Sequence, residues 1–126
     1  MNFVAVRCFM QRIEMVERTK TLALRIIRLV SKLPKSDVGR VIGSQLLRSG
    51  TSIGANYREA ARSATKKHFT AILITALREA DETLYWLELL AESNTVKPAL
   101  LTDLTSESNQ IVAILSASVK KARQLP

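Results

Sequence analysis

The chain has 126 residues, of which 47% are hydrophobic, and it contains only four glycines and three prolines. These numbers fit one domain with an ample apolar core, and they argue against a turn-rich all-β fold. The single cysteine, Cys8, allows no internal disulfide, so we expect a cytoplasmic protein. The apolar runs are too short to span a membrane and the N-terminal segment does not resemble a signal peptide, so we expect no membrane association.

The net charge of +8 is distributed unevenly along the chain. Residues 1–78 hold 15 basic and 4 acidic residues, whereas residues 79–126 hold 4 basic and 7 acidic residues. The two parts therefore carry net charges of +11 and −3. Such asymmetry indicates a surface that faces nucleic acid, complementary surfaces that meet in an oligomer, or simply a basic protein whose charges are solvated.

Apolar residues recur every three or four positions through four segments, which predicts helices at about 12–33, 37–63, 66–92 and 97–123. The first two apolar rows comprise Ile13, Val16, Ala23, Ile26, Val30 and Leu33, then Val38, Ile42, Leu46, Ile53, Tyr57 and Ala60. Ser36 and Thr65 suit the N-caps of the second and third helices, and Pro98 suits the first turn of the fourth. Because the joints are short, we predict that residues 1–126 form a single all-α domain, an antiparallel up-down-up-down four-helix bundle.

The second predicted helix carries all four glycines of the chain, within an arc of roughly 60° on a helical projection. They are Gly39, Gly43, Gly50 and Gly54. A glycine in a helix interior costs about 1 kcal/mol relative to alanine, so four on one face are not expected by accident. We therefore predict that another backbone approaches this face closely.

Beside the glycines runs a polar row that we interpret as a hydrogen-bonding seam between helices. It comprises Gln45, Ser52, Asn56, Glu59 and Ser63. In an antiparallel hairpin that turns near Ala64, Arg48 comes level with Glu79, and Gln45 with Glu82. We predict that Arg48 pairs with Glu79, with Glu82 or with both. If Trp86 is buried one turn further on, its indole N–H should find an acceptor.

The sequence does not predict a catalytic, metal or cofactor site. Ser49 and Ser52 have no nearby histidine, because His68 is the only one in the chain. The acidic residues around Glu79 lack the Glu-x-x-His motifs of di-iron bundles. Cys8 has no helix N-terminus or histidine arranged to activate it. We therefore expect a protein without enzymatic activity, and a small enzyme is only a remote alternative.

Basic residues form the one pattern that predicts a ligand. The candidate nucleic-acid-binding residues are Arg18, Arg25, Arg28, Lys32, Lys35, Arg40, Arg58, Arg62, Lys66 and Lys67. Because aromatic residues hardly interleave with them, binding of RNA or DNA should be directed to the phosphate backbone and be weakly sequence-specific. The alternative is a protein–protein scaffold, in which the basic face meets an acidic partner or the acidic half of a neighbouring copy. The candidate acidic residues are Glu88, Glu92, Asp103 and Glu107.

The segments QLLRSGTSIGANYREA (45–60) and READETLYWLELL (78–90), with Phe69 between them, resemble a known bacterial family. It is the four-helix-bundle family first noticed as reading frames inside intervening sequences of large-subunit ribosomal RNA genes. The resemblance spans about Met15 to Leu90, and the fourth helix matches only by pattern. His68 departs from it, because relatives usually have an acidic residue there. Met1, Met10 and Met15 are all possible starts.

The resemblance implies a ring-like homopentamer built from four-helix bundles. It also implies kinship with the accessory variability determinant proteins of diversity-generating retroelements, which are basic bundles that work with a reverse transcriptase and nucleic acid. No catalytic residues come with it. The positions that carry over have an expected structural role, and they are Gln45, Arg48, Ser52, Asn56, Glu59, Glu79, Glu82 and Trp86.

Overall fold

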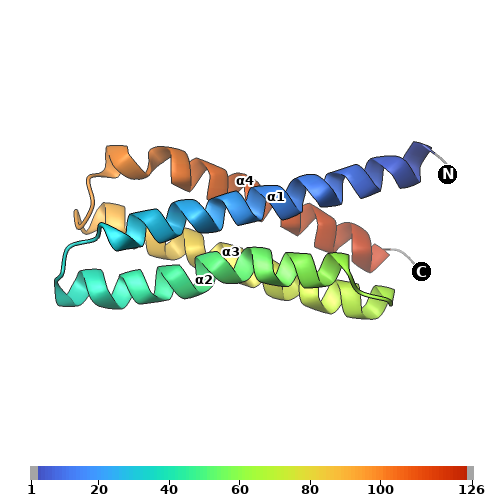
Figure 1. Cartoon of the computed structure of the whole chain (residues 1–126), viewed down its shortest axis with the longest axis horizontal. Coiled ribbons are helices and arrows are strands. Elements are labelled where there is room, and N and C mark those ends of the chain that lie inside the picture. The colour runs from blue at the N-terminus through green and yellow to red at the C-terminus, as the bar shows by residue number, and fades with distance from the viewer. Residues whose placement is uncertain (1–2, 125–126) are drawn as a thin grey trace.

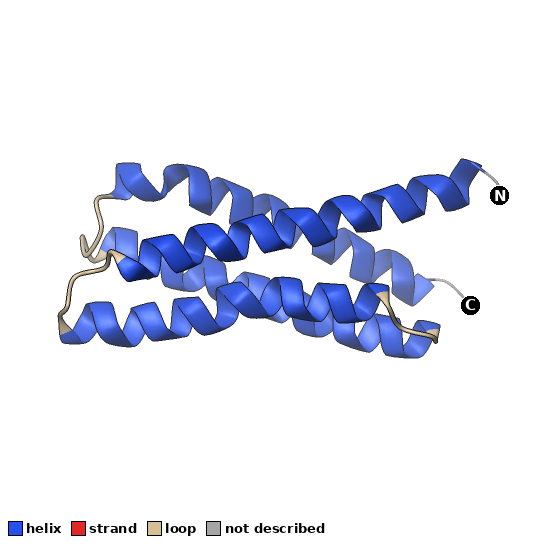
Figure 2. Ribbon diagram, in the orientation of Figure 1, coloured by secondary structure: helices blue, strands red, loops and turns tan. Residues whose placement is uncertain are grey.

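The computed structural model describes residues 3–124, which form four α-helices and no strand. The helices are α1 (Phe3–Ser31), α2 (Asp37–Ala61), α3 (Lys66–Glu92) and α4 (Pro98–Gln124). They run antiparallel to their neighbours along one long axis (Figure 1), and short loops connect them (Figure 2). The predicted all-α four-helix bundle is confirmed. The ring-like assembly stays a prediction, because this is the structure of one chain.

The helix bounds differ from the predicted ones mainly at the start of α1. This helix begins at Phe3 rather than near residue 12. No glycine or proline occurs between Phe3 and Met15, so nothing in the chain ends the helix there. Two of the possible starts, Met10 and Met15, thus lie inside α1, whereas Met1 lies outside the described residues.

Side chains close the helix ends as the sequence predicts. The Ser36 hydroxyl accepts a hydrogen bond from the Gly39 amide at 3.1 Å, and the Thr65 hydroxyl accepts one from the His68 amide at 3.2 Å. Between α3 and α4, Asn94 has a φ of 57°, a left-handed conformation that asparagine tolerates better than most residues. The Ser36 and Thr65 caps fix where α2 and α3 begin, and so they keep the first two joints short.

The core lies along the bundle axis and consists mostly of Leu, Ile and Ala from all four helices. Two residues of the predicted apolar rows are exposed, since Ile13 is 51% and Val38 is 48% exposed. Ile13 precedes the buried Met15 by two residues, a rotation of about 200°, so its side chain faces away from the core. Val38 lies in the first turn of α2, at the edge of the bundle.

The glycines of α2 allow α1 to pack closely against it. A Cβ atom at Gly54 would lie 3.4 Å from the backbone carbonyl carbon of Thr19, and one at Gly50 would lie 2.4 Å from Ile26 Cδ1. Gly43 faces Leu33 in the same way. The predicted close approach therefore occurs between α2 and α1 of the same chain.

The helices do not pack evenly around the bundle. The helix pairs α1–α2, α2–α3 and α3–α4 share long interfaces, whereas α1 and α4 touch over a much shorter length. Figure 1 shows the first turns of α1 separating from the last turns of α4. We call this end of the bundle, which also holds the α2–α3 joint, the terminal end. The opposite end holds the α1–α2 and α3–α4 joints.

Candidate nucleic-acid interface and polar seam

An ion-pair cluster joins α2 to α3 where the register predicts it. The Arg48 guanidinium lies 3.1 Å from Glu79 and also pairs with Glu82. The Trp86 indole N–H donates to the same Glu82 carboxylate at 3.2 Å, so the half-buried ring has the expected acceptor. Gln45 does not reach Glu82, and its side-chain oxygen instead accepts a hydrogen bond from Arg48 at 3.2 Å.

The rest of the predicted seam does not cross between helices in this chain. The Ser52 hydroxyl donates to the Arg48 carbonyl, and the Asn56 amide donates to the Ser52 carbonyl at 2.8 Å. Ser63 likewise donates to the Glu59 carbonyl, and the Glu59 side chain is exposed. Short polar side chains readily bond to the carbonyl one turn earlier in their own helix, so the helix itself provides the partner.

A buried hydrogen bond between α2 and α3 lies instead at Ser49 and Thr83, which the sequence analysis did not include in the seam. Their hydroxyl oxygens are 3.0 Å apart, and both residues are fully buried. The signal was present in the sequence, because Thr83 lies three residues after Ala80 and four before Leu87, at helical spacing with two apolar residues. A buried polar side chain needs a hydrogen-bond partner, and the Thr83 hydroxyl lies within reach of two: the Glu79 carbonyl of its own helix at 2.8 Å and the Ser49 hydroxyl of the facing helix.

Replacing Arg48 by methionine is expected to lower the free energy of unfolding by about 1 kcal/mol, the scale of partly exposed ion pairs. The loss follows because Glu79 and Glu82 would remain as neighbouring negative charges without their cation. Arg58→Met is a matched control, since Arg58 also lies on α2 and has no ion pair within residues 3–124. Equal denaturation midpoints for the two variants would show that the cluster does not stabilise the fold.

The predicted basic surface loses one member to an interface inside the chain. Arg18 donates to the Glu107 carboxylate at 2.6 Å and to the Gln110 side chain at 3.2 Å, both on α4. The hydrogen bond to Glu107 raises the pKa of Arg18 above its usual value, and burial opposes this effect. Arg18 therefore ties α1 to α4 and is not a free cation for a ligand. Glu107, one of the acidic residues expected to meet cations in an assembly, is therefore already paired within the chain.

The other nine predicted cations fall into two groups at opposite ends of the bundle. One group lies around the α1–α2 joint and comprises Arg25, Arg28, Lys32, Lys35 and Arg40. The second lies around the α2–α3 joint, at the terminal end, and comprises Arg58, Arg62, Lys66 and Lys67. A helical projection does not separate the two groups, because it shows direction around the helix axis and not position along that axis. Arg25 is half-buried, and the other eight are exposed.

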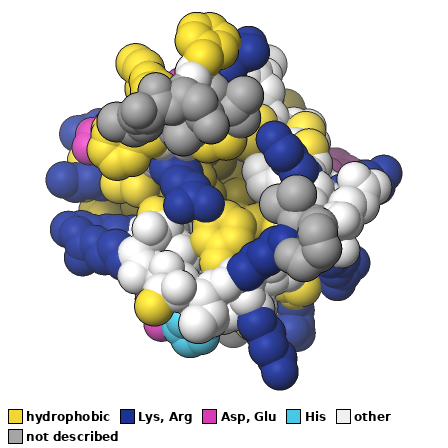
Figure 3. Space-filling view, turned by 90° about the vertical axis from the view of Figure 1, so that its right-hand side faces the viewer, with side chains coloured by type: hydrophobic (Ala, Val, Ile, Leu, Met, Phe, Trp, Pro, Cys, Tyr) yellow, Lys and Arg dark blue, Asp and Glu magenta, His cyan; other side chains and the backbone are white. Residues whose placement is uncertain are grey.

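Sequence reasoning missed five further cations at the terminal end. They are Arg7, Arg12, Lys120, Lys121 and Arg123, all exposed. Lys66 and Lys67 of α3 and Arg123 of α4 line one shallow depression, so α3 and α4 share this surface. Figure 3 views the molecule from this end and shows Lys and Arg side chains around most of its edge, with few acidic ones. We call these five residues, with Arg58, Arg62, Lys66 and Lys67, the basic end.

The two joints of the opposite end mix both signs of charge. Glu88, Glu92 and Asp103 are exposed near the α3–α4 joint, at the same end as Arg28, Lys32 and Lys35. Asp37 also pairs with Arg40 there. The charges of these groups partly cancel, whereas the nine cations of the basic end outnumber the exposed acids near them, Glu14 and Glu59. The basic end therefore has a clear excess of positive charge that can attract anions.

Between residues 3 and 124, no three His, Cys, Asp or Glu side chains gather in a group that could hold a metal ion. In the same range no helix is long and apolar enough to cross a membrane.

Comparisons with known proteins place this bundle among its relatives. A search of curated proteins found no match. Among solved structures, the chain is similar to the 1.70 Å crystal structure of a protein of unknown function from the S23 ribosomal protein family of Bacteroides thetaiotaomicron. The two share 35% identity and a TM-score of 0.80, over 86% of this chain and 97% of that one. The family described as 23S rRNA-intervening sequence protein matches residues 11–117. This chain belongs to that family of 23S rRNA-intervening sequence proteins.

Proposed function

We propose that the protein is a non-enzymatic, cytoplasmic accessory protein that assembles into a homopentamer and binds RNA or DNA through its basic end. The single observation that carries the proposal is the gathering of nine exposed Lys and Arg side chains at that end. In a ring, symmetry would repeat this surface in every subunit. The partner would be nucleic acid alone, or nucleic acid together with an enzyme that acts on it, such as a reverse transcriptase.

The chemistry of the basic end favours phosphate over base contacts. Arg58, Arg62 and Lys67 have no ion pair within residues 3–124, so binding to phosphate would not first require breaking one. Flexible cations on the ends of four different helices do not form the rigid reading surface that base edges require. The expected binding is therefore weakly sequence-specific. The names of the relatives, which refer to 23S rRNA and to a ribosomal protein family, agree with a nucleic-acid setting.

A second candidate function, a protein–protein scaffold, is favoured by a different observation. The outer face of α1 exposes a row of large apolar side chains that includes Phe9, Ile13, Leu24 and Ile27. Exposed apolar rows of this kind mark surfaces that contact other proteins. In the homopentamer this row would serve assembly, whereas in the scaffold it would bind a different protein.

The test is direct binding of the purified, nuclease-treated protein to labelled single-stranded RNA, single-stranded DNA and duplex DNA. We expect the triple change Arg58→Glu, Arg62→Glu and Lys67→Glu to weaken binding about 100-fold or more at low salt, because phosphate contacts dominate affinity. The matched control reverses Arg28, Lys32 and Lys35, which changes the net charge equally at the opposite end. We expect this control to weaken binding less than about tenfold.

Two results would contradict the nucleic-acid function. One is no binding by a correctly assembled wild-type oligomer at low salt, which would move the assignment to the protein scaffold. The other is an equal loss in both triple variants, which would mean that net charge alone matters and not the basic end. Circular dichroism and the oligomer size of each variant would be measured alongside, so that loss of fold is not mistaken for loss of contacts.

A further inference from the structure

A cavity of about 490 Å³ opens at the terminal end, where α1 and α4 separate. All four helices contribute to its wall. The cavity forms because α1 and α4 do not pack against each other at this end. Its volume lies within the range of small-molecule sites, roughly 300–1,000 Å³. Figure 3 shows the corresponding hollow, with apolar side chains at its floor and basic side chains around it.

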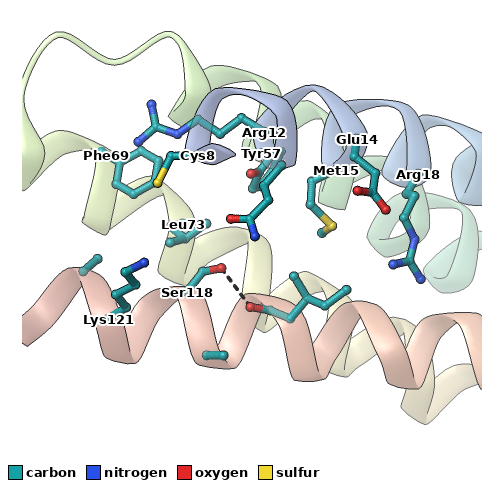
Figure 4. A pocket seen from close by; sticks show the side chains of 14 residues that line it. Cys8, Arg12, Glu14, Met15, Arg18, Tyr57, Phe69, Leu73, Ser118 and Lys121 are labelled. Atoms are coloured by element: carbon teal, nitrogen blue, oxygen red, sulfur yellow. Dashed lines mark hydrogen bonds between the residues drawn. The ribbon is translucent and has the colours of Figure 1, made fainter. Parts of the chain in front are cut away.

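The floor of the cavity is apolar and comes from three helices. Met15 of α1, Phe69 and Leu73 of α3 and Ile114 of α4 line it. Figure 4 shows the Met15 and Leu73 side chains facing α4 across the open space. Such a floor binds hydrocarbon or arene groups by removing their surface from water.

One hydroxyl in the cavity wall, that of Tyr57, has no hydrogen-bond partner in the described part of the chain. Tyr57 as a whole is only 6% exposed. No fully buried polar side-chain atom of residues 3–124 lacks a partner, so the Tyr57 oxygen is reached by solvent and its donor is free to bond a ligand in the cavity. The other hydroxyl in the wall, that of Ser118, already donates to the Ile114 carbonyl at 2.8 Å (Figure 4).

Cations from two helices stand at the mouth of the cavity. The Arg12 guanidinium lies 4.7 Å from the centre of the Phe69 ring, and Lys121 approaches from α4 on the other side (Figure 4). Neither has an ion pair within residues 3–124. Arg18 also lines the wall, but it is bound to Glu107. The ionisable groups of the wall, which include one acid, Glu14, therefore leave a net positive charge.

We propose that this cavity binds an amphipathic organic anion, a carboxylate with an apolar chain or ring. The carboxylate would lie between Arg12 and Lys121, and the Tyr57 hydroxyl would donate a hydrogen bond to it. The apolar part would rest on Met15, Phe69, Leu73 and Ile114. The proposal does not depend on nucleic-acid binding, because the cavity, its apolar floor and the Tyr57 hydroxyl are features that phosphate contacts would not use.

The electrostatics of Tyr57 agree with a donor role. Burial raises the pKa of its hydroxyl above the usual value, and the nearby charge of Arg12 opposes that rise. The hydroxyl is therefore protonated at neutral pH, and it can donate to an anion while Arg12 and Lys121 supply positive charge. A neutral or cationic ligand of the same shape would lose these interactions.

The experiment compares three probes of equal chain length by calorimetric titration: decanoate, 1-decanol and decylammonium. We expect one decanoate per chain, bound about tenfold or more tightly than the other two, because only the carboxylate gains hydrogen bonds from charged groups. Arg12→Gln with Lys121→Gln should weaken decanoate about tenfold or more, and Tyr57→Phe a few-fold. Lys120→Gln is the control, because Lys120 directly precedes Lys121 on α4 but lies outside the cavity wall; this variant should bind like the wild type.

A second variant separates binding in the cavity from binding elsewhere. Ala117 lines the cavity but is exposed, so Ala117→Trp should fill the space while the bundle keeps its fold. We expect a folded Ala117→Trp protein to bind no decanoate. Wild-type affinity in that variant, equal affinity for the three probes, or no binding to the wild type would each overturn the proposal. None of these results bears on nucleic-acid binding, which the charge-reversal variants test separately.

Discussion

Replacing Gly50 by valine is expected to lower the free energy of unfolding by about 3 kcal/mol, the upper part of the range for overpacked cores. A Cβ atom at this position would lie 2.4 Å from Ile26 Cδ1, 3.0 Å from Cγ2 and 3.4 Å from Cβ. Ile26 is fully buried and β-branched, so it has few rotamers into which it can move. The gain in helix propensity over glycine is smaller than about 1 kcal/mol and cannot offset the clash. Chemical denaturation of the variant and the wild type measures the difference.

Gly43→Val is the matched control for this experiment. Gly43 lies two turns earlier on the same face, but a Cβ there would meet Leu33 Cδ1 at 2.9 Å and Val30 Cγ1 only at 3.6 Å. Leu33 is partly exposed and follows the end of α1, so its side chain can shift. We expect a loss of less than about 1 kcal/mol. If Gly43→Val were as destabilising as Gly50→Val, the close contact with Ile26 would not be the cause.

A change from 50 to 200 mM salt is expected to weaken nucleic-acid binding by about 1,000-fold or more, if six or more of the nine cations of the basic end contact phosphate. The physical reason is that each phosphate neutralised by Lys or Arg releases condensed counterions, which costs more when the salt concentration is higher. The slope of the logarithm of the binding constant against the logarithm of the salt concentration would be measured by fluorescence anisotropy.

Neutralising variants test whether this slope comes from the basic end. Arg58→Gln, Arg62→Gln and Lys67→Gln together should reduce the slope by about three for each subunit in contact with nucleic acid. Arg28→Gln, Lys32→Gln and Lys35→Gln remove the same charge from the opposite end and should leave the slope nearly unchanged. A slope that stays at the wild-type value in the first triple variant would place the phosphate contacts elsewhere.

The polar residues show how far a helical projection can predict contacts. Arg48, Glu79 and Glu82 were placed together because an antiparallel hairpin fixes the register, and long side chains reach across it. Ser52 and Asn56 lie on the same side of α2, but their short side chains bond within the helix. The projection gives the direction of a side chain and not its length or its competing partners. The Ser49–Thr83 hydrogen bond was not predicted because both residues lie on the core face, outside the polar row of α2.

The sequence by itself determined the four helices, their caps, the bundle class and the family, because apolar periodicity, capping residues and local segments are properties of neighbouring residues. The sequence also indicated that the glycine face of α2 packs closely. Only the tertiary structure decided which cations are free and where they gather, since Arg18 is neutralised by a residue 89 positions away. It also decided that α1 and α4 separate and leave a cavity beside Tyr57. Both outcomes depend on distances between helices that are remote in the chain, which no local pattern specifies.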